Sequence, residues 1–307
     1  MRLLKQLCSI QATSGDESAM ADFLLDYIKK NSKNWKVKPV IYSGEQWQEN
    51  IILVFGQPKT AVYAHIDSIG YTTGYNRNLI KIGGPHNIDG TKLVGKDSKG
   101  KIEAELMVIE NQDGSRTLEY LFKRDIERGT PLTFKPNWRE TKDFVQCCYM
   151  DNRLGVWTAL KMAGTLENGA IVFSTYEEHG GGSVGYIARF LQEKYGIRQS
   201  LVADITWVTK GVKHGKGVAV SMRDSGIPRR KFVNRIITLA KKSKIPFQLE
   251  VESAGGSDGT EIQKSNNIID WCFIGAPEDH VHSPDEIVHK KDIKAMVDLY
   301  IYLMKHL

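Results

Sequence analysis

The sequence predicts an α/β protein that is interrupted by an all-β insert. Helical and strand-like patterns alternate along most of the 307 residues, as in proteins whose helices cover a largely parallel sheet. After position 67, turn signals and strand-like runs continue for about 80 residues without an amphipathic helix. The length suits one large domain or two, and 41% hydrophobic residues are typical of globular proteins.

The first part of the chain predicts two helices and then two strands. A helix opens the chain, and Ser14 and Glu17 have the spacing of a capping box, which predicts an N-cap at Ser14 for the second helix. Residues 51–55 and 60–66 are short apolar runs rich in β-branched or aromatic residues. We expect them to be adjacent strands of a central sheet.

The insert is expected to occupy residues 68–146. Clusters of glycine, proline and aspartate separate strand-like runs such as residues 101–109 and 117–122. Residues 1–67 and 147–307 then form one discontinuous domain, because the alternation of helix and strand resumes after the insert.

The second half of the chain predicts a regular series of elements. In chain order they are a helix over 152–164, a strand over 170–175, a helix over 183–194, strands over 200–206 and 217–221, a helix over 229–241, strands over 247–252 and 268–274, and a helix over 291–307.

Charge and apolar pattern exclude several classes of protein. Lysine and arginine number 42 against 36 acids, a net charge of +6, but the basic residues are scattered and no aromatic platform accompanies them, so we expect no nucleic-acid partner. No run reaches the roughly 18 apolar residues of a membrane span, and we expect neither a span nor a signal peptide. The four cysteines lack C-x-x-C spacing, which suits reduced thiols in a cytoplasmic protein.

Acids and histidines collect at five points where predicted strands end or helices begin. Such points are where open α/β sheets build their sites. The five segments are His65-x-Asp67, Asp151-Asn152-Arg153, Glu177-Glu178, Asp204, and residues 278–286 with His280 and His282.

Four of these segments, taken alone, also have a structural explanation. His65 and Asp67 can form a polar strand end, Asp151 can cap a helix, Asp204 can serve a structural hydrogen bond, and residues 278–286 can be a surface loop. The remaining pair of adjacent carboxylates directly follows an apolar strand. Carboxylates in such a place need charge compensation, which two cations would supply.

Taken in order, the segments resemble the motifs of the TET or glutamyl aminopeptidases, a family of dinuclear metallo-aminopeptidases in which some members carry the name endoglucanase. The resemblance covers nearly the whole chain. It implies a three-layer peptidase domain around a central mixed sheet, an inserted all-β, barrel-like domain, and a cis peptide bond between Asp151 and Asn152. It is carried by His65-x-Asp67, Asp151-Asn152-Arg153-x-Gly155, Glu177-Glu178, Asp204 and His282-Ser283-Pro284.

The family resemblance implies two divalent metal ions per subunit, zinc or cobalt, with manganese as a further candidate. Asp151 is then the carboxylate that bridges the two ions. His65 and Asp204 complete the protein ligands of one ion, and Glu178 and His282 those of the other.

The resemblance also implies roles for two acids that do not bind metal. Glu177 is expected to be the general base, because it stands beside a ligand without being one. Asp67 is expected to orient the imidazole of His65.

A glycine-rich loop and an arginine are candidates for binding substrate. Arg223 follows the strand over 217–221 and would favour acidic side chains, with an ordinary surface arginine as the alternative. The loop is similar to one that lines the family's substrate cleft, and its candidate residues are Gly255, Gly256, Ser257 and Asp258.

The resulting expectation is a cytoplasmic, metal-dependent aminopeptidase that acts on short peptides and self-associates through the insert, from a dimer up to a dodecamer. Two alternatives remain open: a carboxypeptidase or amide deacylase of the wider dinuclear group, and a non-catalytic oligomeric binding protein of the same fold. An endoglucanase finds little support, because metal ligation explains these acids better than a pair of glycosidase carboxylates does.

Overall fold

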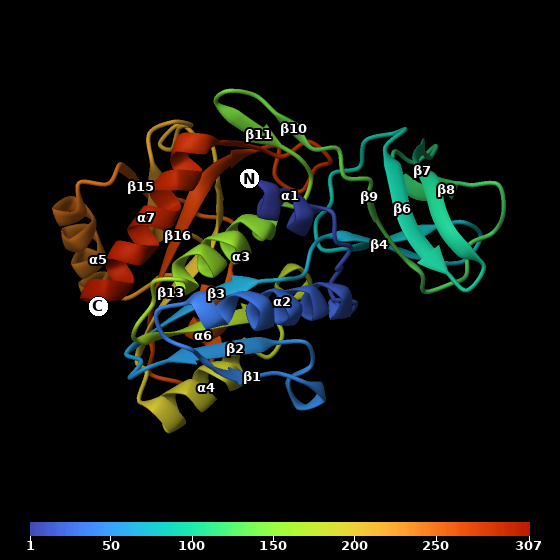
Figure 1. Cartoon of the computed structure of the whole chain (residues 1–307). Helices are drawn as coiled ribbons and strands as arrows, with labels where there is room; N and C mark the ends of the chain where they lie inside the picture. The colour runs from blue at the N-terminus through green and yellow to red at the C-terminus, as the bar shows by residue number, and fades with distance from the viewer.

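The computed structural model describes all 307 residues and contains two β-sheets, one of 11 strands and one of six (Figure 1). None of the helices combines the length and the apolar character that crossing a membrane requires. The α-helices are α1 (Arg2–Cys8), α2 (Ser18–Asn31), α3 (Met150–Ala163), α4 (Val184–Tyr195), α5 (Arg230–Ser243), α6 (Asp258–Lys264) and α7 (Lys290–His306).

The strands of the larger sheet come from both ends of the chain and flank the smaller sheet in sequence. The larger sheet contains β1 (Val40–Tyr42), β2 (Ile51–Phe55), β3 (Thr60–His65), β10 (Arg139–Glu140), β11 (Phe144–Gln146), β12 (Gly169–Ser174), β13 (Gln199–Trp207), β14 (Val218–Arg223), β15 (Phe247–Val251), β16 (Asp270–Asp279) and β17 (Ile287–His289). The smaller sheet contains β4 (Gly70–Thr73), β5 (Leu79–Ile82), β6 (Lys92–Asp97), β7 (Gly100–Glu110), β8 (Arg116–Leu121) and β9 (Pro131–Phe134).

Helices cover both faces of the larger sheet, which confirms the predicted three-layer arrangement. Along β2, Ile51, Leu53 and Phe55 face one side and Ile52 and Val54 face the other, because successive side chains of a strand alternate. The first side packs against α1, α2, α3, α5 and α7, and the second against α4 and α6. Each face therefore has its own apolar core.

The larger sheet is mixed, as predicted, with the order β1-β2-β12-β3-β13-β16-β17-β11-β10, and β14 and β15 attached beside β16. The strands β12, β3, β13 and β16 are parallel, so their carboxyl ends meet at one edge. The expectation that β2 and β3 are neighbours is wrong, because β12 lies between them. The connection between β2 and β3 passes the start of β12, where the N–H of Gln57 donates to Oδ1 of Asn168 at 2.8 Å.

The smaller sheet is antiparallel and nearly closed. Its strand order is β5-β4-β9-β6-β7-β8, and an isolated bridge between Asn78 and Glu119 joins its two edges, which confirms the barrel-like shape. No helix occurs between β3 and α3, as the sequence predicted. In Figure 1 this sheet stands to one side of the larger one, and the β10–β11 hairpin that follows it pairs with the larger sheet through β17.

Tyr149 joins the interiors of the two sheets. Its ring stacks on Phe134 of β9 at 6.1 Å, and its hydroxyl accepts a hydrogen bond from the Phe134 N–H. Phe134 in turn meets Tyr71 of β4 edge-on at 6.0 Å, and all three side chains are buried. The apolar interior of the insert is therefore continuous with the main core immediately before Asp151.

Local differences from the sequence prediction have physical causes. The N-cap of α2 is Glu17 rather than Ser14, because the Ser14 hydroxyl donates instead to the buried carboxylate of Asp67 at 2.6 Å. The glycine-rich segment after β15 leads into the unpredicted short helix α6, for which Ser257 accepts the Gly259 N–H. Strand β16 continues past its predicted end to Asp279, because it pairs with β13 as far as Glu278 and with β17 at Glu278 and Asp279.

Candidate metal centre and substrate pocket

The topology brings the five predicted metal ligands to one edge of the larger sheet. His65 is the last residue of β3, and Asp204 lies in β13. Glu178 lies in the short 3₁₀ turn that follows β12, and His282 lies in the loop that follows β16. Asp151 is in the first turn of α3, and its peptide bond to Asn152 is cis, as expected.

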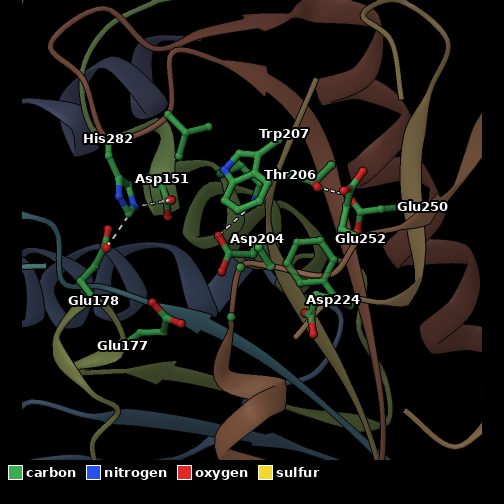
Figure 2. Close-up of a pocket in the computed structure, with 16 residues that line it drawn as sticks. Asp151, Glu177, Glu178, Asp204, Thr206, Trp207, Asp224, Glu250, Glu252 and His282 are labelled. Carbon is green, nitrogen blue, oxygen red and sulfur yellow. Dashed lines mark hydrogen bonds and ion pairs between the residues drawn. The ribbon is translucent and has the colours of Figure 1, made fainter. Parts of the chain in front are cut away.

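Asp151 lies between the two histidines, with one carboxylate oxygen toward each. Its Oδ1 is 3.2 Å from Nε2 of His65, and its Oδ2 is 3.4 Å from Nε2 of His282. Figure 2 shows Asp151 between His282 and Asp204. A carboxylate that divides its oxygens in this way has the arrangement of a bridge between two ions.

Each histidine has a second carboxylate beside it. Oδ2 of Asp204 is 3.6 Å from Nε2 of His65, and Oε2 of Glu178 is 3.1 Å from Nε2 of His282 (Figure 2). Ligand atoms of His65, Asp151 and Glu178 also lie within 4.8 Å of one another. The set divides into two groups that share Asp151.

Burial and mutual repulsion shift the pKa of three acids in this cluster. Burial is the main cause of the raised pKa values of Glu177, Glu178 and Asp204, and neighbouring carboxylates raise them further. Bound cations would relieve both effects, because they compensate the charge that burial disfavours.

The residues present fit divalent cations. The donors are imidazole nitrogens and carboxylate oxygens, which suit zinc and related metals. Oε1 of Glu178 is buried without a hydrogen-bond partner, which leaves a lone pair free for a ligand. No lysine or arginine lines the adjoining pocket to neutralise these acids instead.

Asp67 is fully buried and fixes several parts of the cluster at once. Its Oδ1 accepts the Glu177 N–H at 3.1 Å and lies 3.3 Å from Nδ1 of His65. Its Oδ2 accepts the Glu178 N–H at 3.1 Å and the Ser14 hydroxyl. Burial works against its ionisation, but His65, Ser14 and the Glu178 N–H together lower the pKa of Asp67.

Two further buried residues, to which no role was assigned from the sequence, form hydrogen bonds with backbone groups of the predicted ligands or of residues next to them. Glu286 is buried, and its carboxylate accepts the N–H of Asp151 at 3.3 Å and that of His282 at 3.1 Å. Arg153 is also buried, and its guanidinium donates to the carbonyl oxygens of Ile66 and Asp67. Arg153 is itself part of the Asp151-Asn152-Arg153 motif, and the only sequence signal for Glu286 was its place two residues beyond the Ser-Pro of the last motif.

A pocket of about 300 Å³ opens beside the cluster. Glu177 lines it together with four of the predicted ligands, His65 being the exception. Its Oε2 lies 3.8 Å from Nε2 of His65, and its side chain is 17% exposed. Glu177 is therefore beside the cluster and open to the pocket.

The predicted substrate-binding residues divide into two groups. Gly255 and Gly256 line the pocket. Ser257 and Asp258 are buried outside it, with Asp258 accepting the Ser174 hydroxyl. Arg223 does not line the pocket either, and its Nε donates to the carbonyl oxygen of Asp224 at 3.1 Å.

Known proteins share this fold. An aminopeptidase from the archaeon Desulfurococcus kamchatkensis has a TM-score of 0.84 at 20% identity, covering 100% of this chain and 94% of its own. The TET1 peptidase of Pyrococcus horikoshii has a TM-score of 0.80 at 21% identity, covering 99% of this chain and 98% of its own. A protein of Acetivibrio thermocellus assigned as an aminopeptidase is 26% identical over 331 residues, covering 97% of this chain and 96% of its own length.

The sequence model of the M42 glutamyl aminopeptidases matches residues 81–299, a span that includes every proposed ligand except His65. The match covers more than half of the 307 residues. The chain therefore belongs to the M42 glutamyl aminopeptidase family and is an aminopeptidase, a hydrolase of peptide bonds.

Proposed function

We propose that the enzyme uses two divalent cations to release N-terminal residues from short peptides. His65 and Asp204 would hold one cation, Glu178 and His282 the other, and Asp151 both. Zinc or cobalt suits this mixture of nitrogen and carboxylate donors, and manganese is a further candidate. The observation that carries the proposal is the division of the Asp151 carboxylate, with Oδ1 toward His65 and Oδ2 toward His282.

Glu177 is the proposed general base. When bound, the cations polarise the scissile carbonyl and lower the pKa of the attacking water. Glu177 takes the proton from that water and passes it to the departing amine as the carbon–nitrogen bond breaks. Its backbone N–H is held by Asp67 at 3.1 Å, while its side chain stays open to the pocket, which supports this role.

The insert is proposed to shape access to the pocket and to mediate self-association. On this proposal residues 1–67 and 147–307 form the peptidase domain and residues 68–146 the inserted domain, whose last two strands, β10 and β11, pair with the larger sheet through β17. The TET1 peptidase of Pyrococcus horikoshii assembles into a tetrahedron or a large octahedral shell. The insert here exposes large apolar side chains that a partner subunit could cover: Tyr75, Ile80, Ile88 and Leu121, each more than half exposed.

The cytoplasm is the proposed location. All four cysteines are free and buried, and reduced thiols suit a reducing compartment.

Glu177→Gln tests the mechanism, because it removes the base and leaves every proposed ligand in place. We expect turnover of leucyl-p-nitroanilide to fall about 10²- to 10⁴-fold, the usual contribution of a general base. Zinc content, measured by mass spectrometry after metal loading, should stay the same.

The matched control is Glu193→Gln, which changes an exposed glutamate of α4. It should retain both turnover and zinc content. Retained turnover in Glu177→Gln would contradict the assigned base. Faster release from N-acetylated than from free-amine substrates by the wild type would contradict the aminopeptidase specificity.

A further inference from the structure

The pocket has a second acidic region beyond the proposed metal ligands. Asp224 follows the end of β14, Glu250 lies in β15, and Glu252 follows it. Figure 2 shows these three side chains on the opposite side of Asp204 from Glu178 and His282. All three line the same pocket as Glu177.

The parallel pairing of β14 and β15 brings the three acids together. Ser221 is in register with Glu250, and the N–H of Glu252 donates to the carbonyl of Arg223 at 3.0 Å, directly before Asp224. None of the proposed metal ligands lies in β14 or β15 or directly after either strand. They therefore form a region separate from the metal cluster.

Two of these acids are buried, and neither forms an ion pair with a lysine, arginine or histidine of the protein. Glu250 is 2% exposed and Asp224 is 7% exposed. One oxygen of Glu250 accepts the Thr206 hydroxyl, and one oxygen of Asp224 accepts the Gly226 N–H at 2.6 Å. The second oxygen of Asp224 accepts no hydrogen bond from the protein, and both carboxylates line the pocket. Besides Thr206, the Ser221 hydroxyl lowers the pKa of Glu250.

Such carboxylates favour a positively charged ligand. Burial is the main cause of the raised pKa values of Asp224 and Glu250. A cation in the pocket would compensate for this loss of solvation, and an anion would add to the repulsion. Arg223, the sequence candidate for binding acidic substrates, does not line the pocket. Its charge lowers the pKa of Asp224, but burial outweighs that effect.

The pocket wall between the two acidic regions is largely apolar. Ile205 and Trp207 of β13 and Phe273 of β16 line it, and Trp207 lies beside Asp204 in Figure 2. A long side chain with an aliphatic stem and a positively charged end matches this pocket, because the stem can lie on the apolar wall and the charged end can reach the acids. The indole of Trp207 adds an aromatic face that attracts cations.

We propose that this region binds the side chain of an N-terminal lysine or arginine, so that the enzyme prefers basic N-terminal residues. The inference rests on the proposed function, in which the α-amine and the scissile bond lie at the metal cluster. The stem of the side chain then packs along Trp207 and Phe273, and its charged end reaches Asp224, Glu250 and Glu252.

The test compares lysyl-p-nitroanilide with norleucyl-p-nitroanilide, whose side chain has the same four-carbon stem without the charge. We expect kcat/KM to be about 10- to 100-fold higher for lysine, the range given by a hydrogen bond to a charged group. Glutamyl-p-nitroanilide should be the poorest substrate of the three.

Three variants locate the preference. Glu250→Gln keeps the size of the side chain and an oxygen that can accept from Thr206. Glu252→Gln changes a side chain that is only partly buried. Both should bring the lysine-to-norleucine ratio toward one. Glu193→Gln, the exposed control, should leave the ratio unchanged, and thermal melting checks that each variant is folded.

Three outcomes would overturn the proposal, and they show which part of it fails. Equal kcat/KM for lysine and norleucine in the wild type, or a ratio unmoved in both pocket variants, would refute the basic preference and leave the aminopeptidase mechanism standing. Failure to cleave any free-amine substrate with metal supplied would refute the proposed function itself, and the preference with it.

Discussion

Asp67 offers the sharpest test of how the protein orients the proposed metal ligands. The change Asp67→Asn keeps the shape of the side chain but replaces one acceptor oxygen by a donor NH₂ group. In the native protein Oδ1 faces the Glu177 N–H and Oδ2 faces the Glu178 N–H, each at 3.1 Å. Whichever way the asparagine turns, its NH₂ group faces a backbone N–H and one of these bonds is lost.

The expected cost follows from those contacts. One hydrogen bond to a charged acceptor is lost, which is about 1.5–3 kcal/mol of unfolding free energy. The imidazole of His65 also loses the carboxylate 3.3 Å from its Nδ1, and residues that orient a ligand typically contribute about 10- to 100-fold in metal affinity. Ser14→Ala, the matched control, removes a single donor to Asp67 and should have a smaller effect on both quantities.

Two measurements separate the structural effect from the effect on the metal. Urea unfolding of chelator-treated protein gives the stability change, and calorimetric titration with Zn²⁺ gives the change in affinity. A loss of stability with unchanged zinc affinity would refute the reasoning, because Asp67 would then support the fold without orienting His65.

Two further predictions concern the fold. Gly155→Ala should lower the unfolding free energy by at least about 1–3 kcal/mol in urea titration, since the new Cβ would lie 2.1 Å from the carbonyl oxygen of Ala203. Gly185→Ala is the control, because its new Cβ would make only ordinary contacts, and it should not lower the unfolding free energy. Equal losses of unfolding free energy in the two variants would contradict the steric argument. In the insert, hydrogen bonds from Arg124 are the main cause of a pKa of about 2 for Asp97. The pair therefore stabilises the protein fully at pH values above about 3.9, the ordinary aspartate pKa, and this stabilisation is lost as the pH falls toward 2. The melting-temperature gap between wild type and Asp97→Asn should therefore be full at pH 7 and shrink below pH 4, and a gap independent of pH would contradict this.

The meeting of the predicted ligands at one sheet edge could be predicted from the sequence because strand ends are local features, whereas their assignment to two metal ions came from the family resemblance. His65 ends an apolar run, Glu178 follows another, and Asp204 interrupts a third. Parallel strands bring such ends together whatever their exact order. The prediction therefore survived the wrong assumption that β2 and β3 are neighbours.

The second acidic region of the pocket could not be predicted in the same way. Asp224 and Glu250 become neighbours only because β14 and β15 pair in parallel beside β16, a contact between segments that no local pattern specifies. Arg223, one position away, has the opposite charge and suggested the opposite preference. Glu286 was similarly hidden, because its role is to accept two backbone N–H groups that the sequence does not mark.

The stacking of Tyr149 on Phe134 has a consequence for local unfolding of the protein. Local unfolding of the smaller sheet would free Phe134 and with it the residue two positions before Asp151. The two regions should then open as one cooperative unit. A ligand that holds Asp151 in its native place would, by mass action, also protect the backbone amides of β9 from hydrogen exchange, although it touches none of them.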